Sequence, residues 1–468
     1  MTIVAKLIEQ TQLNPEKIVI QDKDRAVTSA KFITDIHNVA SSLKGKNVLS
    51  ETNVIIYASN SYAFICTYFA VHLLSARSVV VDPKSETNFL QFIVNKVRPS
   101  YIVSSPEELF NSQSNIHKVK NKAENSLIAD ILFTSGTTGE PKGVALSHQQ
   151  ILDSTLHILS NVGNNETDIE LLLMPLSHSF GLGRMRSALY AGTVLVIGYP
   201  LNRMKQVFKA IEQHKVTGFG IVPAAWEFIL KMSRDKIVEY SSQIQYIELG
   251  SAYFSPENKQ TMRSWFPETN LVMHYGLTEV SRAIFSRFHH DPHESLGIID
   301  IGTDVRILAP DSSIQGHGIE GEIALRSNWM LSEYLDNPNL TKASFSDGFF
   351  KTGDLGLING KHLYLKGRLK EVINVGGKKV NPQDVESALK KMKFISDCAC
   401  VAYPDPDMGE VVKAFVVFTE QNMCSEQEIK KYLHDKLPSH MRPQYYENID
   451  SIPKTANGKI QRLKLKSS

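Results

Sequence analysis

The sequence predicts an α/β protein with a large N-terminal domain of doubly wound sheets plus a β subdomain, followed by a small mobile α+β C-terminal domain. Three observations predict this fold. Short β-branched runs alternate with helical patterns from Asn53 to Leu249, which is typical of a parallel sheet covered by helices. After about Gly297, Gly and Asp turns separate the strands. Beyond Arg368 a new set of helices and strands begins.

Apolar runs place the elements of the large domain. A buried helix is expected at 62–74, where Thr67 and His72 interrupt an apolar stretch shorter than the ~20 residues that span a bilayer. No stable membrane insertion is therefore predicted. The expected strands lie at 53–59, 78–83, 100–105, 131–134, 171–174, 193–198, 218–222 and 246–249.

The small domain is predicted to span 369–468 and the large one 1–368, with a hinge near Lys370. Within the small domain we expect a helix opened by a capping box, in which Ser425 and Glu428 satisfy each other's backbone N–H groups. The other expected elements are a helix at 382–392 and strands at 398–402 and 411–418.

Charge and cysteine content exclude several classes of function. The 51 basic and 49 acidic residues leave a net charge of +2, so no global field attracts nucleic acid, and no nucleic-acid partner is predicted. The four cysteines lack the C-x-x-C spacing of a zinc or redox site and are expected to be reduced and mostly buried. Lys6 and Glu9 in the N-terminal stretch argue against a signal peptide, which predicts a cytoplasmic protein.

A strand followed by a loop of small and hydroxylic residues predicts an anion site. The segment 131–143 reads ILFTSGTTGEPKG, and its glycines let backbone N–H groups converge on phosphate oxygens. Hydroxyl groups add donors, and Lys142 supplies a mobile positive charge. The spacing does not fit the G-x-x-x-x-G-K-[ST] loop of Walker-type NTPases. The alternative interpretation is a flexible surface linker.

This loop and four further motifs resemble the adenylate-forming superfamily, which includes acyl-CoA and aryl-CoA synthetases, luciferases and the adenylation domains of peptide synthetases. The motifs occur in the family's order and cover the chain from about residue 130 onward, whereas the first hundred residues match only in general α/β texture. They are TSGTTGEPKG at 134–143, HYGLTE at 274–279, TGDLG at 352–356, GRLKEVINVGGKKVNPQDVE at 367–386 and PKTANGKIQR at 453–462.

The resemblance implies a nucleotide site. It assigns Tyr275 to stacking on adenine, Thr278 to the α-phosphate and Glu279 to magnesium, which prefers hard oxygen ligands. It assigns Asp354 and Arg368 to the ribose, although either also fits an ordinary salt bridge. The other nucleotide- or cofactor-binding residues expected by motif position are Thr134, Ser135, Gly136, Thr137, Thr138, Gly139, Lys142, Gly250, Ser251, Ala252, Gly276, Lys370, Gly376 and Gly377.

Lys459 is the expected catalytic lysine by the same resemblance. An ammonium group beside the α-phosphate lowers the barrier electrostatically when the acid's carboxylate attacks phosphorus. Because Lys459 belongs to the small domain, the resemblance implies that the domains close for adenylation and then rotate near Lys370. The rotation would withdraw the lysine and bring Gly376 and Gly377 toward the thiol tunnel.

The segment MPLSHSFGLG at 174–183 resembles the part of the family that enters the acid pocket. His178 matches the family's gate residue and joins Lys459, Thr278 and Glu279 in the expected catalytic set. Ser179 stands where amino-acid-activating relatives place an aspartate, which argues against an α-amino acid substrate. The expected pocket residues, whose mixture suits an aryl or medium-length acyl acid, are Ser179, Phe180, Gly220, Tyr253, His274 and Ser281.

The resulting hypothesis is an AMP-forming acid–thiol ligase. It uses ATP and Mg²⁺ to convert a carboxylic acid into an acyl-adenylate and passes the acyl group to coenzyme A. A second hypothesis replaces coenzyme A with the phosphopantetheine of a free-standing carrier protein. A third, of another class, is a non-catalytic adenine-nucleotide sensor, against which the complete motif set argues. A homodimer is left open.

Overall fold

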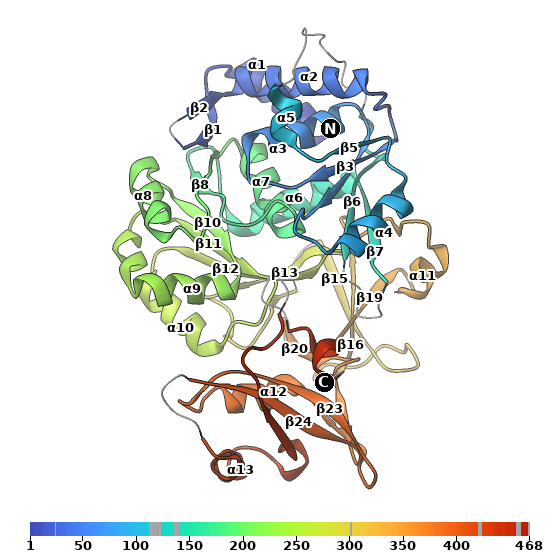
Figure 1. Ribbon diagram of the computed structural model, residues 1–468, viewed down its shortest axis with the longest axis vertical. Coiled ribbons are helices and arrows are strands. Elements are labelled where there is room, and N and C mark those ends of the chain that lie inside the picture. Colours follow the sequence, from blue (N-terminus) through green and yellow to red (C-terminus); the bar gives the residue numbers. More distant parts are fainter. Residues whose placement is uncertain are drawn as a thin grey trace. The chain divides into compact units, whose positions relative to one another are not determined.

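The computed structural model describes residues 1–23, 25–111, 119, 123–134, 140–299, 302–419, 424–454 and 460–466 and consists of two compact units (Figure 1). Unit 1 combines Met1–Asp304 with Leu325–Phe350, and unit 2 combines Val305–Ala324 with Lys351–Ser468. The mixed α/β architecture confirms the predicted fold class. The boundary after Arg368 stays a prediction.

Unit 1 contains a six-stranded sheet with the order β17-β7-β6-β4-β3-β5. Its strands β3, β4, β5 and β6 pair in parallel, whereas β6–β7 and β7–β17 are antiparallel. The bounds are β3 (Asn53–Tyr57), β4 (Arg77–Val81), β5 (Tyr101–Val103), β6 (Ile128–Thr134), β7 (Lys142–Ser147) and β17 (Glu333–Tyr334). The helices between these strands are α3 (Tyr62–Leu73), α4 (Thr87–Val97) and α5 (Pro106–Asn111). Every residue of α3 is buried, as predicted.

The second sheet of unit 1 runs in the order β14-β13-β12-β11-β10-β8-β9-β1-β2. It is parallel from β12 to β1 and antiparallel at both ends. The strands are β1 (Ile18–Asp22), β2 (Arg25–Thr28), β8 (Ile169–Leu171), β9 (Val194–Ile197), β10 (Gly218–Ile221), β11 (Tyr246–Gly250), β12 (Asn270–Leu277), β13 (Ser281–Arg287) and β14 (Gly297–Ile298). The remaining elements of unit 1 are α1 (Ile3–Leu13), α2 (Ser29–Gly45), α6 (His148–Val162), α7 (Ser179–Ala191), α8 (Met204–His214), α9 (Pro223–Ser233), η1 (Lys236–Tyr240), α10 (Pro256–Trp265), α11 (Pro338–Ala343) and β18 (Phe345–Ser346).

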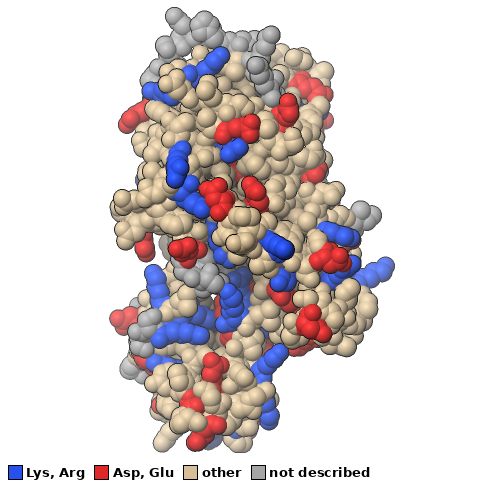
Figure 2. Space-filling view, turned by 90° about the vertical axis from the view of Figure 1, so that its right-hand side faces the viewer, with Lys and Arg blue, Asp and Glu red and all other residues tan. Residues whose placement is uncertain are grey.

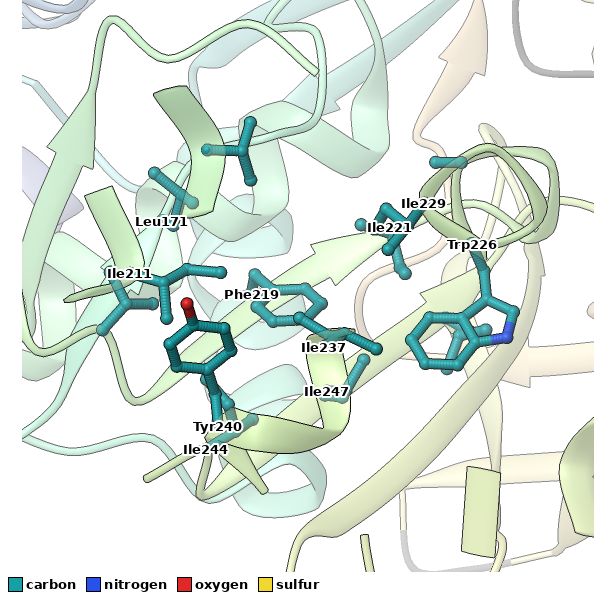
Figure 3. Close-up of a cluster of buried hydrophobic side chains, with 14 of the residues drawn as sticks. Leu171, Ile211, Phe219, Ile221, Trp226, Ile229, Ile237, Tyr240, Ile244 and Ile247 are labelled. Atoms are coloured by element: carbon teal, nitrogen blue, oxygen red, sulfur yellow. The ribbon is translucent and has the colours of Figure 1, made fainter. Parts of the chain in front are cut away.

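The two faces of this second sheet are buried by different chemistry. On one face, the apolar side chains of β10 and β11 pack against α8, α9 and η1 (Figure 3). Phe219 and Ile247 lie on this face, and Trp226 of α9 is only 1% exposed. On the other face, β11 presents Tyr246, Glu248 and Gly250, because successive side chains of a strand alternate between faces. A buried glutamate on a central strand needs partners, and α7 supplies one of them.

Four strands have most of their residues in unit 2 and are neighbours in the order β15 (Thr303–Leu308), β16 (Gly321–Ser327), β19 (Phe349–Asn359) and β20 (His362–Arg368). A separate sheet has the order β22-β21-β24-β23, with β25 paired to β24. Its bounds are β21 (Ile373–Val375), β22 (Lys378–Val380), β23 (Ile395–Asp405), β24 (Gly409–Phe418) and β25 (Tyr445–Asn448). The helices are α12 (Pro382–Leu389), α13 (Glu426–His434), η2 (Ser439–Met441) and α14 (Arg462–Lys466). The predicted capping box of Ser425 and Glu428 opens α13.

Most predicted bounds differ by a few residues at one or both ends, and two predicted elements end three residues earlier than expected. The strand expected at 171–174 ends at Leu171, because the chain there leaves the sheet to reach α7. Asn60 satisfies the backbone instead: its side-chain amide donates to the carbonyl of Met174 at 2.9 Å, and its Oδ1 accepts from the N–H of Leu176 at 2.9 Å. The helix expected at 382–392 ends at Leu389.

All four cysteines are free thiols, and Cys66, Cys398 and Cys400 are buried. Burial raises the pKa of Cys398 to about 12 and that of Cys400 well above its usual value. Charged side chains of both signs alternate over the face in Figure 2, consistent with the small net charge. Within the described ranges, no helix has the length and apolar character needed to cross a membrane.

Candidate active site

The hairpin of β12 and β13 carries the predicted nucleotide residues of unit 1. Thr278 and Glu279 lie in the turn between the two strands, and Tyr275 lies in β12 beside a bulge in the register. A Cβ at Gly276 would lie 1.8 Å from the carbonyl oxygen of Ser281, so only glycine allows the strands to approach this closely. The hairpin therefore presents the side chains of Thr278 and Glu279 at its tip.

Tyr334 connects Glu279 with the lysine of the predicted phosphate loop. Its hydroxyl donates to Oε1 of Glu279 at 2.9 Å, and the ammonium of Lys142 lies 5.5 Å from the centre of its ring. Burial and the neighbouring carboxylate raise the pKa of Tyr334, which keeps the phenol protonated as a donor. The contact exists because β17 pairs with β7 and places Tyr334 opposite Val144.

The donor set at this turn fits magnesium. Among the described residues, no hydrogen bond reaches Oε2 of Glu279, so one oxygen remains for a cation. No group of three or more His, Cys, Asp or Glu side chains able to hold a metal occurs in the described part of the chain. A single carboxylate is the usual protein contribution when Mg²⁺ also takes oxygens from nucleotide phosphates and water.

The ends of the predicted phosphate loop are held together by strand pairing. Thr134 ends β6 and is paired with Lys142 at the start of β7. Five of the predicted loop residues, Ser135, Gly136, Thr137, Thr138 and Gly139, lie outside the described residues. Their role in phosphate binding stays a prediction.

The predicted adenine segment follows β11. A Cβ at Gly250 would lie 2.0 Å from the ring of His274, so glycine is needed for the neighbouring strand's histidine to fit. Ser251 has a φ of 71°, and Ala252 is half-buried. Tyr253 is 60% exposed, so its predicted place in the acid pocket has no support from burial.

In unit 2, the two predicted ribose residues pair with each other. Asp354 of β19 and Arg368 of β20 are cross-strand partners, and Nε of Arg368 lies 3.0 Å from Oδ1 of Asp354. Asp354 is buried whereas Arg368 is partly exposed. The N–H of Asp354 donates to the hydroxyl of Thr352 at 3.1 Å, which fixes the backbone of the TGDLG motif.

The remaining unit 2 residues lie in turns. Lys370 is exposed in the turn that follows β20. Gly376 and Gly377 form the two-residue turn between β21 and β22, with φ angles of 53° and 82°. Two positive φ angles in a two-residue hairpin are typical of a type I′ turn, which favours glycine. The N–H of Gly376 also donates to the carbonyl of Met408 at 2.9 Å.

Lys459 lies outside the described residues, but the segments that flank it are anchored. Lys454 and Ile460 form an antiparallel bridge. The buried side chain of Arg462 donates to Glu371 at 2.9 Å, to the carbonyl of Cys400 at 2.9 Å and to both carboxylate oxygens of Glu386. The described residues on either side of Lys459 are therefore anchored within unit 2.

Four of the predicted acid-site residues, His178, Ser179, Phe180 and His274, lie at or against the start of α7. His178 is the residue before this helix; its Nε2 is buried with no hydrogen-bond partner in the described ranges, and burial lowers its pKa. The rings of Phe180 and His274 meet edge to face at 4.7 Å. Nδ1 of His274 lies 2.7 Å from Glu248, yet burial lowers the pKa of this histidine overall. Ser179 and Ser281 are half-buried.

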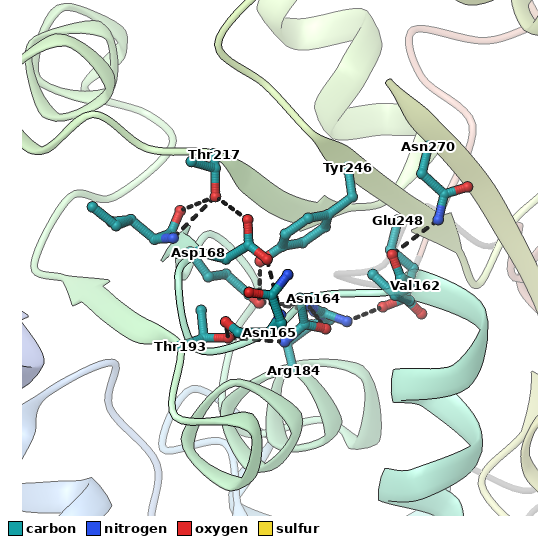
Figure 4. Close-up of polar contacts among 12 residues, drawn as sticks. Val162, Asn164, Asn165, Asp168, Arg184, Thr193, Thr217, Tyr246, Glu248 and Asn270 are labelled. Carbon is teal, nitrogen blue, oxygen red and sulfur yellow. Dashed lines mark hydrogen bonds and ion pairs between the residues drawn. The ribbon is translucent and has the colours of Figure 1, made fainter. Parts of the chain in front are cut away.

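Behind these residues lies a buried charge network that the sequence analysis did not identify. Arg184 of α7 donates from Nη1 to Glu248 at 3.1 Å (Figure 4). It also donates from Nε to Glu170 at 2.8 Å. Glu248 also accepts from Arg282 of β13, and Glu170 accepts from the hydroxyl of Tyr246 at 2.9 Å. All five side chains are buried. A single glutamate among the apolar residues of β8 and another in β11 were the available signals.

Comparison with known proteins identifies the family. The profile described as AMP-binding enzyme matches residues 7–335, and that of the AMP-binding enzyme C-terminal domain matches residues 384–459. The chain belongs to the AMP-binding enzyme family. This AMP-binding enzyme is 26% identical to the long-chain-fatty-acid–CoA ligase FadD13 of Mycobacterium tuberculosis, over 95% of this chain and 93% of that protein. It is 26% identical to 4-coumarate–CoA ligase 3 of Arabidopsis thaliana, over 96% and 88%.

Solved structures share the fold of this AMP-binding enzyme. The o-succinylbenzoate CoA synthetase MenE from Bacillus subtilis, in complex with its acyl-adenylate intermediate, matches with a TM-score of 0.91 at 24% identity, over 99% of this chain and 98% of that one. ATP-bound MatB from Rhodopseudomonas palustris matches with a TM-score of 0.90 at 21% identity, over 100% and 99%. The predicted resemblance to adenylate-forming enzymes is confirmed, and the chain is an AMP-forming enzyme of the carboxylate–CoA ligase type.

Proposed function

We propose that this AMP-binding enzyme uses ATP and Mg²⁺ to convert a carboxylic acid into an acyl-adenylate with release of pyrophosphate, and then transfers the acyl group to coenzyme A. The observation that supports it most directly is the contact of Tyr334 with both Glu279 and Lys142. It assembles a carboxylate suited to Mg²⁺ and a cation suited to a phosphate on one side of unit 1. The family match and the relatives' CoA ligase activities support the same assignment.

Each residue has a role in this proposal. Thr278 donates to the α-phosphate, Lys142 compensates charge on the outer phosphates, and Glu279 holds the magnesium ion, which supplies further charge compensation when bound. Asp354 and Arg368 bind the ribose. The acid needs no general base, because a carboxylic acid is already ionised at neutral pH. His178, whose buried Nε2 has no partner among the described residues, would orient that carboxylate.

The proposal is tested by incubating the protein with ATP, Mg²⁺ and a panel of carboxylic acids, with and without coenzyme A. Pyrophosphate release and acyl-CoA are measured together. Acyl-CoA formation from an acid supports the full reaction. Pyrophosphate without acyl-CoA would favour a carrier protein as acceptor, and ATP binding without any turnover would favour a nucleotide sensor.

A cytoplasmic location stays a prediction.

Lys459→Ala separates the two half-reactions. We expect loss of adenylate formation by at least about 100-fold, the effect of removing a charge that stabilises the transition state. Thioester formation from a supplied acyl-adenylate should continue, because the lysine acts only on the α-phosphate step. Stopped-flow or quenched assays of each half-reaction provide the measurement. Equal loss in both would contradict the division of labour.

A further inference from the structure

Glycines on one face of the second sheet leave space next to α7. Gly218 and Gly220 lie in β10, and Gly250 lies in β11. Register pairs Gly220 with Glu248 and Gly250 with His274, so these positions share one face. Glycines on a covered face create room that either a ligand or neighbouring side chains can occupy. This space adjoins the predicted acid-pocket residues Phe180 and His274.

The chain's own side chains fill the space next to the predicted pocket. A Cβ at Gly220 would lie 3.1 Å from the Cγ of Arg184 and 3.2 Å from the ring of Phe180. A Cβ at Gly250 would lie within 2.2 Å of two atoms of the His274 ring. These glycines therefore accommodate arginine, phenylalanine and histidine side chains, and a ligand cannot enter here unless those side chains move.

Side chains also fill the space beside two further glycines, one in β10 and one in α7. A Cβ at Gly218 would lie 2.2 Å from the ring of Tyr246, and one at Gly183 of α7 would lie 2.2 Å from the guanidinium of Arg282. Arg282 in turn stacks over Phe180 at 4.9 Å and donates to its carbonyl at 3.0 Å. The interface between α7 and this part of the sheet is thus closed by ionic and aromatic side chains.

Displacing these side chains is costly because their charges are balanced inside the protein. Glu170 and Glu248 are fully buried, and Arg184 pairs with both while Arg282 pairs with Glu248. Separating one partner from a buried ion pair leaves an uncompensated charge in the protein interior and is therefore strongly unfavourable. A flexible apolar chain would need to open this network to pass between the sheet and α7.

We propose that the buried network of Glu170, Arg184, Glu248 and Arg282 closes the inner end of the acid pocket, so that the enzyme activates compact acids, short aliphatic or single-ring aromatic, and excludes long acyl chains. This rests on the proposed function and on the predicted pocket residues Phe180, Gly220 and His274. The substrate class therefore differs from the long-chain acids named for the FadD13 relative.

The first test uses non-hydrolysable acyl-sulfamoyl adenosines carrying acetyl, butanoyl, benzoyl or dodecanoyl groups, with affinity measured by calorimetry. We expect the dodecanoyl compound to bind at least about 100-fold more weakly than the best compact one, the factor that corresponds to opening a buried ion pair. Equal or tighter binding of the dodecanoyl compound would overturn the proposal. Weak binding of all four compounds by a protein that binds ATP in a separate titration would instead contradict the proposed ligase function.

The second test enlarges the pocket. Glu170→Gln with Arg184→Ala removes one charge of each sign and leaves Glu248 paired with Arg282. We expect the relative affinity for the dodecanoyl compound to rise at least tenfold toward that of the butanoyl compound, a change of about 1.4 kcal/mol. The matched control is Asp130→Asn with Arg186→Ala, a second buried pair made by α7, at 2.9 Å. It should keep the wild-type preference, and an equal shift in the control would overturn the assignment.

Thermal unfolding of both double variants is recorded alongside. If the Glu170→Gln/Arg184→Ala protein does not fold, the chain-length series on the wild-type enzyme decides. A wild-type ATP–pyrophosphate exchange rate that is as high with dodecanoate as with butanoate or benzoate would overturn the proposal. A rate confined to the compact acids would support it.

Discussion

Tyr334 contacts two side chains that are far apart in the sequence, Glu279 and Lys142. Tyr334→Phe keeps the ring beneath Lys142 and removes the hydrogen bond that orients the carboxylate. A hydrogen bond to a charged group contributes about 1.5–3 kcal/mol, so we expect a roughly tenfold or larger rise in the Mg²⁺ concentration needed for half-maximal ATP–pyrophosphate exchange. Binding of Mg·ATP, measured by calorimetry, should weaken in parallel.

A matched control for Tyr334→Phe is Tyr445→Phe, because Tyr445 is 45% exposed in β25. This control should leave the Mg²⁺ dependence unchanged. An unaltered Mg²⁺ requirement in Tyr334→Phe itself would show that the hydroxyl does not position Glu279.

His148, the first residue of α6, gives the stability a pH dependence. Burial lowers its pKa from the usual 6.5 to about 3. In the unfolded chain this histidine is therefore protonated below about pH 6.5, whereas in the folded protein it is protonated only below about pH 3. The contribution of neutral His148 to the free energy of unfolding is fully present above pH 6.5. It is lost as the pH falls toward 3, at about 1.4 kcal/mol per pH unit.

His148→Phe keeps an aromatic ring beside His72 and removes the titrating group. The free energy of unfolding, measured with urea between about pH 4 and pH 7, should depend less steeply on pH in this variant than in the wild type. The difference in slope should approach about 1.4 kcal/mol per pH unit, which is the contribution of one titrating group. His290→Gln, at an exposed position, should retain the wild-type slope. An unchanged slope in His148→Phe would show that another group dominates.

Residues that are part of a recognisable sequence motif could be predicted from the sequence. Residues whose contacts depend on strand pairing or on helix–sheet packing were missed. Thr278 and Glu279 were predicted because they are adjacent in one motif. Tyr334 was missed because its partner is set by the pairing of β17 with β7. Arg184 and Glu248 were missed because a charged residue in an apolar run shows no partner until the helix and the sheet are packed together.

At the scale of elements, the β21–β22 hairpin tests the role expected of its glycines. Gly377 has a φ of 82° with open space around it. Gly377→Ala should therefore destabilise the protein by about 1 kcal/mol through backbone strain alone. If this turn also faces the thiol, thioester formation should slow while adenylation keeps its rate. Chemical unfolding and the two half-reaction assays measure the two effects.

Gly316→Ala is the matched control for the hairpin, because Gly316 lacks a positive φ and its Cβ would meet only Ile319 at 3.7 Å. It should alter neither stability nor rate. Loss of adenylation together with thioester formation in Gly377→Ala would indicate general damage to unit 2 and contradict the tunnel assignment.

Elements with strong local signals were predicted closely, and those that depend on distant partners were not. The helix α3 and the capping box of α13 follow from apolar content and from Ser425 and Glu428. The end of β8 at Leu171 depends on the side chain of Asn60, which binds the following backbone from another part of unit 1. Periodicity in a single segment contains no information about such a partner.

For the whole molecule, the predicted hinge at Lys370 makes a kinetic prediction. Lys370→Pro fixes φ near −65° and restricts Leu369, so any rotation at this turn should slow. We expect adenylation to proceed while overall acyl-CoA formation falls by about tenfold or more, as when a conformational step limits turnover. Single-turnover and steady-state rates together provide the measurement. Unchanged steady-state turnover would reject the hinge.

The state of the four thiols affects how the whole enzyme can be assayed. Cys66, Cys398 and Cys400 are buried, and burial raises their pKa values, so few thiolates are present at neutral pH. Only a thiolate attacks a disulfide reagent, so these positions should react slowly. Only Cys424 has appreciable exposure, and its pKa is also raised. A chromogenic disulfide can therefore be added to aliquots withdrawn from the reaction without first removing the enzyme, and its colour reports the coenzyme A that remains unacylated against a nearly constant protein background.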